Sequence, residues 1–244
     1  MKILISTFLL CLFSSTGFSQ QIFVSDIQQT KVLELFSTQG CSSCPPAQAF
    51  VSRLKTNKGL WKSFIPLVFH VDYWDYLGWK DPYAQKRYSL RQRRYVSELG
   101  LNGGYTPMFV LNRYTGSSLS LAKIKERGAE VGVLRVKKQD KNYHVEFKPK
   151  GDQGNGFKLN YAFIANNVAT KVTAGENKGE LLRHDFLVLE SGVETFAKIK
   201  KTYSFNGKIE EPKFPKSTSR AIVFWVTRVN SQVPIQATGG YYKD

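Results

Sequence analysis

Apolar and polar positions follow two different periods along this chain of 244 residues. After residue 30, three short apolar runs are each followed by a segment with helical spacing. This alternation of strand and helix predicts an α/β domain. The apolar runs are 31–36, 64–72 and 103–112, and the helical segments are 44–58, 81–100 and a stretch within 118–131.

Beyond residue 130 the period changes to the two-residue alternation of half-buried strands. A hairpin is expected around Asp140, and no convincing helix interrupts the strands that follow. They are expected within 158–172, 181–190, 196–205 and 221–229. We therefore expect an α/β domain over residues 20–130 and a small antiparallel β-sandwich domain over residues 131–244.

Residues 1–19 have the composition of a secretory signal peptide, with a basic start, an apolar run and small or polar residues at the end. Cleavage is expected between Ser19 and Gln20, and the apolar run is too short to span a membrane. A lipid anchor on Cys11 is the alternative, although Leu10 stands where lipid attachment needs a small residue. We therefore expect a periplasmic or secreted protein that does not span the membrane.

The charge is strongly basic, at +16 for the whole chain. In an exported protein, a basic surface meets acidic lipid head groups, polysaccharides or acidic proteins rather than nucleic acid. A merely solvated surface is the simpler interpretation. We expect no nucleic-acid partner and treat electrostatic contact with the cell envelope as the alternative.

Cys41 and Cys44 stand where the first apolar run meets the first helical segment, in the stretch GCSSCPP. Without the signal segment they are the only cysteines, and a chain of this length needs no single short disulfide to hold its core. The positive end of a helix stabilises a thiolate. Cys41 is therefore expected to act as the attacking thiol, and Cys44 can then resolve a mixed disulfide.

The stretch YTP, residues 105–107, is the expected second half of such a site. A cis bond before Pro107 would free the peptide groups of Thr106 to align an extended polypeptide beside Cys41. Tyr105 and Thr106 are thus candidate substrate-binding residues. A trans proline at the start of a strand is the alternative.

The segments LELFSTQGCSSC and YTPMFV resemble the thioredoxin superfamily. More closely, ELFSTQGCSSCPPA, FHVDYWDYLGWKDP, RQRRY and YTP resemble a family of exported bacterial thioredoxin-like proteins known only as a domain of unknown function. The resemblance covers most of residues 30–112, and GENKGELLRHDFLVLE extends it into the second half. It implies a thioredoxin-like fold, Cys41 as attacking thiol, Cys44 as resolving thiol and Pro107 as the cis-proline, but it implies no substrate.

Two further groups of residues are candidates for the site. Glu34 lies seven residues before Cys41, near where thioredoxins bury a carboxylate. It is expected either to relay a proton to Cys44 or to be a surface acid. The aromatic segment after the second apolar run supplies His70, Trp74 and Trp79 as a substrate-binding wall, or else forms an aromatic mini-core.

The function expected from these residues is thiol–disulfide exchange, without a cofactor, on a protein substrate and with a separate redox recycling partner. One alternative is a non-catalytic binding module whose disulfide is locked. Another is a copper-binding or delivery protein in which Cys41, Cys44 and His70 hold the metal.

Overall fold

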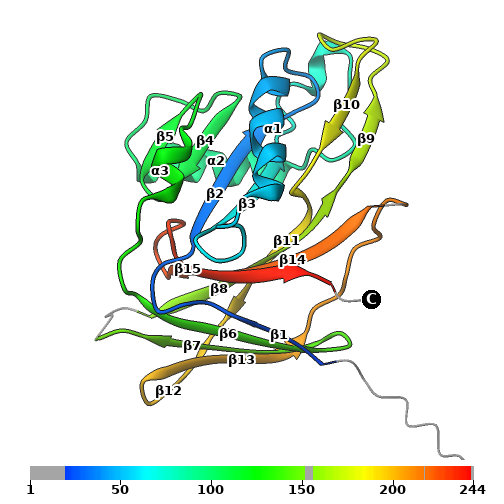
Figure 1. Ribbon diagram of the computed structural model, residues 1–244. Coiled ribbons are helices and arrows are strands. Elements are labelled where there is room, and N and C mark those ends of the chain that lie inside the picture. Colours follow the sequence, from blue (N-terminus) through cyan, green and yellow to red (C-terminus); the bar gives the residue numbers. More distant parts are fainter. Residues whose placement is uncertain (1–19, 152–155, 217, 243–244) are drawn as a thin grey trace, which may run out of the picture.

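The computed structural model describes residues 20–151, 156–216 and 218–242. Over these residues the chain is a mostly β-sheet α/β protein with several sheets and few helices (Figure 1), which confirms the α/β class in this coarse form. The α-helices are α1 (Cys44–Arg53), α2 (Lys86–Glu98) and α3 (Leu121–Lys125), with short 3-10 helices at Leu54–Thr56 and Asp75–Leu77. The strands are β1 (Gln21–Val24), β2 (Lys31–Ser37), β3 (Phe64–His70), β4 (Met108–Leu111), β5 (Tyr114–Gly116), β6 (Gly132–Gln139), β7 (Asn142–Pro149), β8 (Phe157–Asn166), β9 (Val168–Lys171), β10 (Leu181–His184), β11 (Leu187–Thr195), β12 (Ala197–Ile199), β13 (Thr202–Lys208), β14 (Ser219–Arg228) and β15 (Pro234–Tyr241).

The largest sheet combines strands from both halves of the chain, in the order β15-β14-β8-β11-β3-β2-β4-β5. β2 and β3 are parallel, and β4 runs antiparallel to β2 on its other side. β11 joins the two halves because Leu187 pairs in parallel with Val68 of β3. One buried apolar cluster accordingly includes Leu35 and Val68 together with Ile164 and Trp225.

β2 and β3 are buried along their whole length because α1 and α2 cover opposite faces of the sheet. Successive side chains of a strand point to opposite faces, so Ser37 and Glu34 of β2 face different helices. Gln48 of α1 donates to Ser37 Oγ at 2.6 Å. Arg91 of α2 pairs with Glu34 at 2.6 Å. Glu34 and Ser37 therefore belong to separate layers.

A second sheet, of order β1-β6-β7-β13-β12, lies against the antiparallel part of the large sheet (Figure 1). Alternate residues of β6 and β7, such as Val136 and Val145, share a buried core with Phe224 of β14. β1 belongs to this sheet although it precedes the α/β region in sequence. The domain boundary expected at residue 131 stays a prediction, and backbone pairing crosses it at β1 and again at β11.

The helix expected over residues 81–100 begins at Lys86 instead of directly after Asp81. Asp81 is buried, and its carboxylate accepts hydrogen bonds from the backbone N–H groups of Gln39 and Tyr83 at 2.7 and 2.9 Å. Because these groups occupy the carboxylate, it does not cap a helix. The stretch from Asp81 to Gln85 is a turn that places Asp81 behind the cysteine loop.

In the described part of the chain, no helix is long and apolar enough to cross a membrane. The predicted signal segment, residues 1–19, lies outside the described residues.

Candidate active site

Cys41 and Cys44 lie on the loop and first turn that connect β2 with α1. The backbone N–H of Cys44 donates to the carbonyl of Cys41 at 3.2 Å, and Pro45 and Pro46 occupy the first helical turn, where their missing N–H groups are not needed. Both sulfur atoms are free thiols, with Cys41 3% exposed and Cys44 fully buried. Ser42 and Ser43 between them are exposed, so a partner reaches the pair from the serine side.

The surroundings of Cys41 favour its thiolate. A hydrogen bond from the Cys44 thiol is the largest influence, and with smaller contributions from Ser43 and Thr106 it outweighs burial and lowers the pKa of Cys41 to about 5. The sulfur lies 3.2 Å from Ser43 Oγ and 3.7 Å from the carbonyl oxygen of Thr106. Cys41 is therefore ionised at neutral pH.

Cys44 has the opposite character. Its hydrogen bond to Cys41, together with burial, raises the pKa of Cys44, while the Ser37 hydroxyl and the Thr38 backbone N–H lower it in part. One buried dithiol thus holds one proton, which Cys44 keeps. This asymmetry makes Cys41 the nucleophile and Cys44 the thiol held in reserve.

The loop before β4 lies directly beside Cys41, as expected. The peptide bond between Thr106 and Pro107 is cis, as predicted from the sequence. Gln92 of α2 holds this loop by donating to the carbonyl of Tyr105 at 2.7 Å. Tyr105 is 39% exposed and Thr106 is partly buried, so both can contact a polypeptide that approaches Cys41.

The aromatic segment after β3 packs against the cysteine loop, with Tyr73, Trp74 and Trp79 partly buried and Tyr76 exposed. A Cβ on Gly40 would lie 3.3 Å from Cβ of Trp74, so a larger residue there would press on Trp74. Trp79 Nε1 donates to Gln39 Oε1 at 3.0 Å. Burial, with the nearby cysteines contributing, raises the pKa of Tyr73 to about 12. The segment therefore supports the loop, and its exposed edges remain available to a partner.

His70 was expected to bind substrate, and this prediction is wrong because its side chain is fully buried. Its Nδ1 lies 2.7 Å from Asp81 Oδ2 and its Nε2 lies 3.3 Å from Gln48 Nε2. The alternative of a metal held by both cysteines and His70 finds no support in the geometry. Among the described residues, no three His, Cys, Asp or Glu side chains are grouped to hold a metal ion.

Glu34 lies on the face of β2 opposite to Ser37, the residue that hydrogen-bonds Cys44. Its carboxylate accepts from Arg91 Nε and NH2 at 2.6 and 2.7 Å and from the Tyr95 hydroxyl at 2.5 Å. The structure therefore joins Glu34 to α2 and not to the cysteines, and neither a proton relay to Cys44 nor a surface acid describes it.

The β9–β10 hairpin supplies site residues that were not among the predicted ones. Asn177 Nδ2 donates to the carbonyls of Gln39 and Cys41 at 2.8 and 3.0 Å, and Glu176 Oε2 accepts from the backbone N–H of Ser42 at 2.8 Å. At Gly175 φ is +72°, and a Cβ would meet Trp79 at 3.1 Å, so only glycine fits this close approach. The signal was the GENKGE stretch, whose sequence alone indicated only a turn.

The Glu176 carboxylate accepts the hydrogen bond of the Ser42 N–H, next to Cys41 in the loop, and it adds a negative charge there. Replacing Glu176 by Gln keeps an acceptor for Ser42 but removes the charge. We expect the reaction of Cys41 with the anionic disulfide dithiobis(nitrobenzoate) to accelerate about twofold at low salt, and less at high salt, because the charge is exposed and screened. Stopped-flow absorbance measures the rate. Glu180→Gln, on the same hairpin, is the control, and an equal effect of both substitutions would contradict the assignment.

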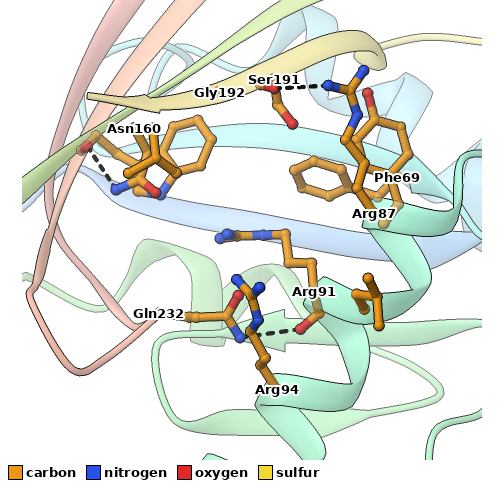
Figure 2. Close-up of a pocket in the computed structure, with 12 residues that line it drawn as sticks. Phe69, Arg87, Arg91, Arg94, Asn160, Ser191, Gly192 and Gln232 are labelled. Carbon is orange, nitrogen blue, oxygen red and sulfur yellow. Dashed lines mark hydrogen bonds between the residues drawn. The ribbon is translucent and has the colours of Figure 1, made fainter. Parts of the chain in front are cut away.

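A cavity of about 150 Å³ lies on the α2 face of the large sheet, away from the cysteines (Figure 2). Arg87, Arg91 and Arg94 of α2 line it, and Figure 2 shows Arg91 and Arg94 side by side. Arg91 is paired with Glu34 and Arg87 with Glu190, so most of this positive charge is already neutralised. We assign the cavity to the packing between α2 and the sheet.

The sequence matches a known family over most of its length. The family model DUF1223, described as a protein of unknown function, matches residues 32–227. The chain belongs to the DUF1223 family. No curated protein matches the sequence significantly.

Two solved structures are similar to this DUF1223 chain. The crystal structure of protein AGR_C_4864 from Agrobacterium tumefaciens has a TM-score of 0.60 at 23% identity, covering 88% of this chain and 94% of that one. The structure of HBP35 of Porphyromonas gingivalis has a TM-score of 0.58 at 16% identity, covering 88% of this chain and 76% of that one. At such identities the likeness establishes a shared fold and says nothing of activity.

Proposed function

We propose that this DUF1223 protein is an exported thiol–disulfide oxidoreductase of the thioredoxin superfamily that acts on other proteins. The observation that carries the proposal is the unequal pair at the start of α1, an ionised Cys41 beside the Thr106 carbonyl and a protonated, buried Cys44. The order of elements supports it, since the pair follows β2, which lies between parallel β3 and antiparallel β4.

The reaction has two steps. The Cys41 thiolate attacks one sulfur of a substrate disulfide, forms a mixed disulfide and releases the other substrate sulfur as a thiolate. The Cys44 sulfur then attacks Cys41 Sγ, the ring closes, and the second substrate sulfur leaves with the Cys44 proton. The substrate gains two electrons, the protein becomes the disulfide, and a recycling dithiol must reduce it again. In reverse, the same steps oxidise a substrate dithiol.

The stabilised thiolate of Cys41 bears on the direction of exchange. A lowered thiolate pKa stabilises the reduced protein relative to its disulfide, which makes the disulfide the stronger oxidant. We therefore place the protein on the oxidising or isomerising side of this chemistry, in the periplasm or outside the cell, where disulfides persist.

A variant in which the reaction stops after the first step tests the proposal. With Cys44→Ser, Cys41 can form a mixed disulfide but nothing resolves it. We expect this variant, produced in its native host with the signal segment intact, to carry protein adducts that dithiothreitol releases. Non-reducing electrophoresis followed by mass spectrometry identifies them.

The double variant Cys41→Ser/Cys44→Ser is the control and must show no such adducts. If Cys44→Ser is equally free of adducts, thiol exchange on proteins is refuted. The fold would then be a binding module whose cysteines take no part in chemistry.

A further inference from the structure

Polar side chains fill the space behind Cys44, where one of the two interpretations of Glu34 placed its carboxylate. They come from β2, the cysteine loop, α1, β3, the turn before α2, and β10, and each is at most 6% exposed. Buried polar groups are stable only when their hydrogen bonds are satisfied, so the donors and acceptors must match throughout. The residues are Ser37, Gln39, Gln48, His70, Asp81 and His184.

One end of this network is fixed by Trp79, because an indole N–H can only donate. It donates to Gln39 Oε1, which turns the amide nitrogen of Gln39 toward His184 Nε2 at 3.0 Å. His184 Nε2 must therefore accept, so the ring proton of neutral His184 lies on Nδ1. Burial is the largest influence on His184 and lowers its pKa to about 3, in keeping with a neutral ring.

The proton on His184 Nδ1 determines the next two bonds. His184 Nδ1 donates to Gln48 Oε1 at 2.5 Å, so the amide nitrogen of Gln48 faces Ser37 Oγ at 2.6 Å. Since Ser37 Oγ accepts this bond, its own hydrogen is free to donate elsewhere. Cys44 lies one turn before Gln48 on the same buried face of α1, and the Ser37 hydroxyl is one of the groups that stabilise its thiolate.

The other end of the network gives the same orientation independently. The Asp81 carboxylate accepts only, and the His70 proton that faces it lies on Nδ1, at 2.7 Å. His70 Nε2 then accepts, which again requires the amide nitrogen of Gln48, at 3.3 Å, on its side. A donor-only indole and an acceptor-only carboxylate thus agree on the direction of every bond between them.

We infer that this network directs the Ser37 hydroxyl hydrogen at the Cys44 sulfur and so stabilises the thiolate that forms when Cys44 resolves the mixed disulfide. The inference rests on the proposed function and assigns Ser37, Gln48 and His184 as positioning residues for its second step. Their effect is a fixed hydrogen bond to a developing negative charge, and no proton travels through the Gln48 amide. The Cys44 proton leaves with the departing substrate sulfur, as in the reaction above.

Two-phase kinetics with dithiobis(nitrobenzoate) test this role on the full mature chain. The first nitrobenzoate thiolate is released when Cys41 attacks, and the second when Cys44 closes the ring, so one absorbance trace reports both steps. We expect Ser37→Ala to keep the rate of the first phase within about twofold of the wild-type rate. The second phase should slow about tenfold, which is the effect of one lost hydrogen bond to a charged sulfur. Ser89→Ala, which removes an equally buried hydroxyl on the α2 face, is the control and should change neither phase.

A second variant keeps the Ser37 hydroxyl but removes the hydrogen bond that orients it. Gln48→Met retains Ser37 but removes the group that directs its hydrogen, and we expect it to slow the same phase about threefold. An unchanged second phase in both variants, or equal slowing of both phases, overturns the inference. Because the reagent replaces any protein substrate, this result is independent of the trapping experiment, whose failure would refute the proposed function alone.

Discussion

Iodoacetamide is expected to alkylate Cys41 at a rate that is constant between about pH 8 and about pH 6, because the group is already a thiolate over that range. The rate should fall to half near the pKa of about 5. Cys44 should remain unmodified, because its proton is held and its sulfur is fully buried. Mass spectrometry of peptides after short exposure distinguishes the two cysteines.

The shape of this pH profile is more informative than the rate at neutral pH. A lower pKa also reduces the intrinsic nucleophilicity of a thiolate, with a Brønsted coefficient of roughly 0.4–0.5. The alkylation rate of glutathione, measured in the same buffers, should fall about tenfold for each unit by which the pH is lowered over this range. If the alkylation rate of Cys41 falls with pH as steeply as that of glutathione, or if both cysteines are modified at similar rates, Cys41 is not stabilised as a thiolate.

Glu34→Leu is expected to lower the free energy of unfolding by about 3–5 kcal/mol, since it leaves the charge of a buried arginine without its partner. The Arg91 side chain is 13% exposed and its guanidinium is held by both oxygens of Glu34. Tyr95 loses one of its two acceptors as well, and the carbonyl of Gln232 remains. Such a loss is a large part of the stability of a typical domain, and urea unfolding of the reduced protein measures it.

Three comparisons make this prediction specific. Glu34→Leu combined with Arg91→Met should recover much of the stability, because no buried charge is then unpaired. Glu210→Gln, which removes a fully exposed ion pair with Lys141, should produce no measurable change. The two-phase thiol kinetics of folded Glu34→Leu should match those of the wild type. Slower ring closure at full stability would instead restore the proton-relay role for Glu34.

The local chemistry of the site could be predicted from the sequence. A strand that ends shortly before Cys41 and a helix that begins at Cys44 follow from an apolar run, two prolines and helical spacing over about fifteen residues. To place Thr106 beside Cys41, the strand before Cys41 must also pair with the strand after Thr106. The structure has this pairing between β2 and β4. These features depend on short segments and on pairing of neighbouring elements.

The polar network could not be predicted in this way, because its partners are far apart in sequence. Gln48 and His184 are separated by 136 residues, and Gln39 and His184 by 145. Asp81 followed by Pro82 is a typical helix start, and only the fold shows that its carboxylate is taken by His70 and by the backbone N–H of Gln39. Tertiary contacts decided these roles.

The position of Glu34 is different, because the sequence already contained the answer. Glu34 and Ser37 are three residues apart in one strand, so they point to opposite faces, and a residue near Cys44 had to share the face of Ser37. The analogy with the buried carboxylate of thioredoxins points to the cysteines, whereas strand alternation places Glu34 on the other face. The arginine that holds Glu34 is Arg91 of α2, and only the fold shows that this one of the helix's basic side chains is buried.

The β9–β10 hairpin has a consequence for the order in which the site is made. Cys41 and Gln48 leave the ribosome long before Asn177 and His184, which lie 136 residues downstream of them and hydrogen-bond them in the folded chain. Until that hairpin is made, the carbonyl of Cys41 lacks its hydrogen bond from Asn177 and the N–H of Ser42 lacks its bond to Glu176. The cysteine loop therefore reaches its final hydrogen-bonded form only after residues 175–184 have been synthesised.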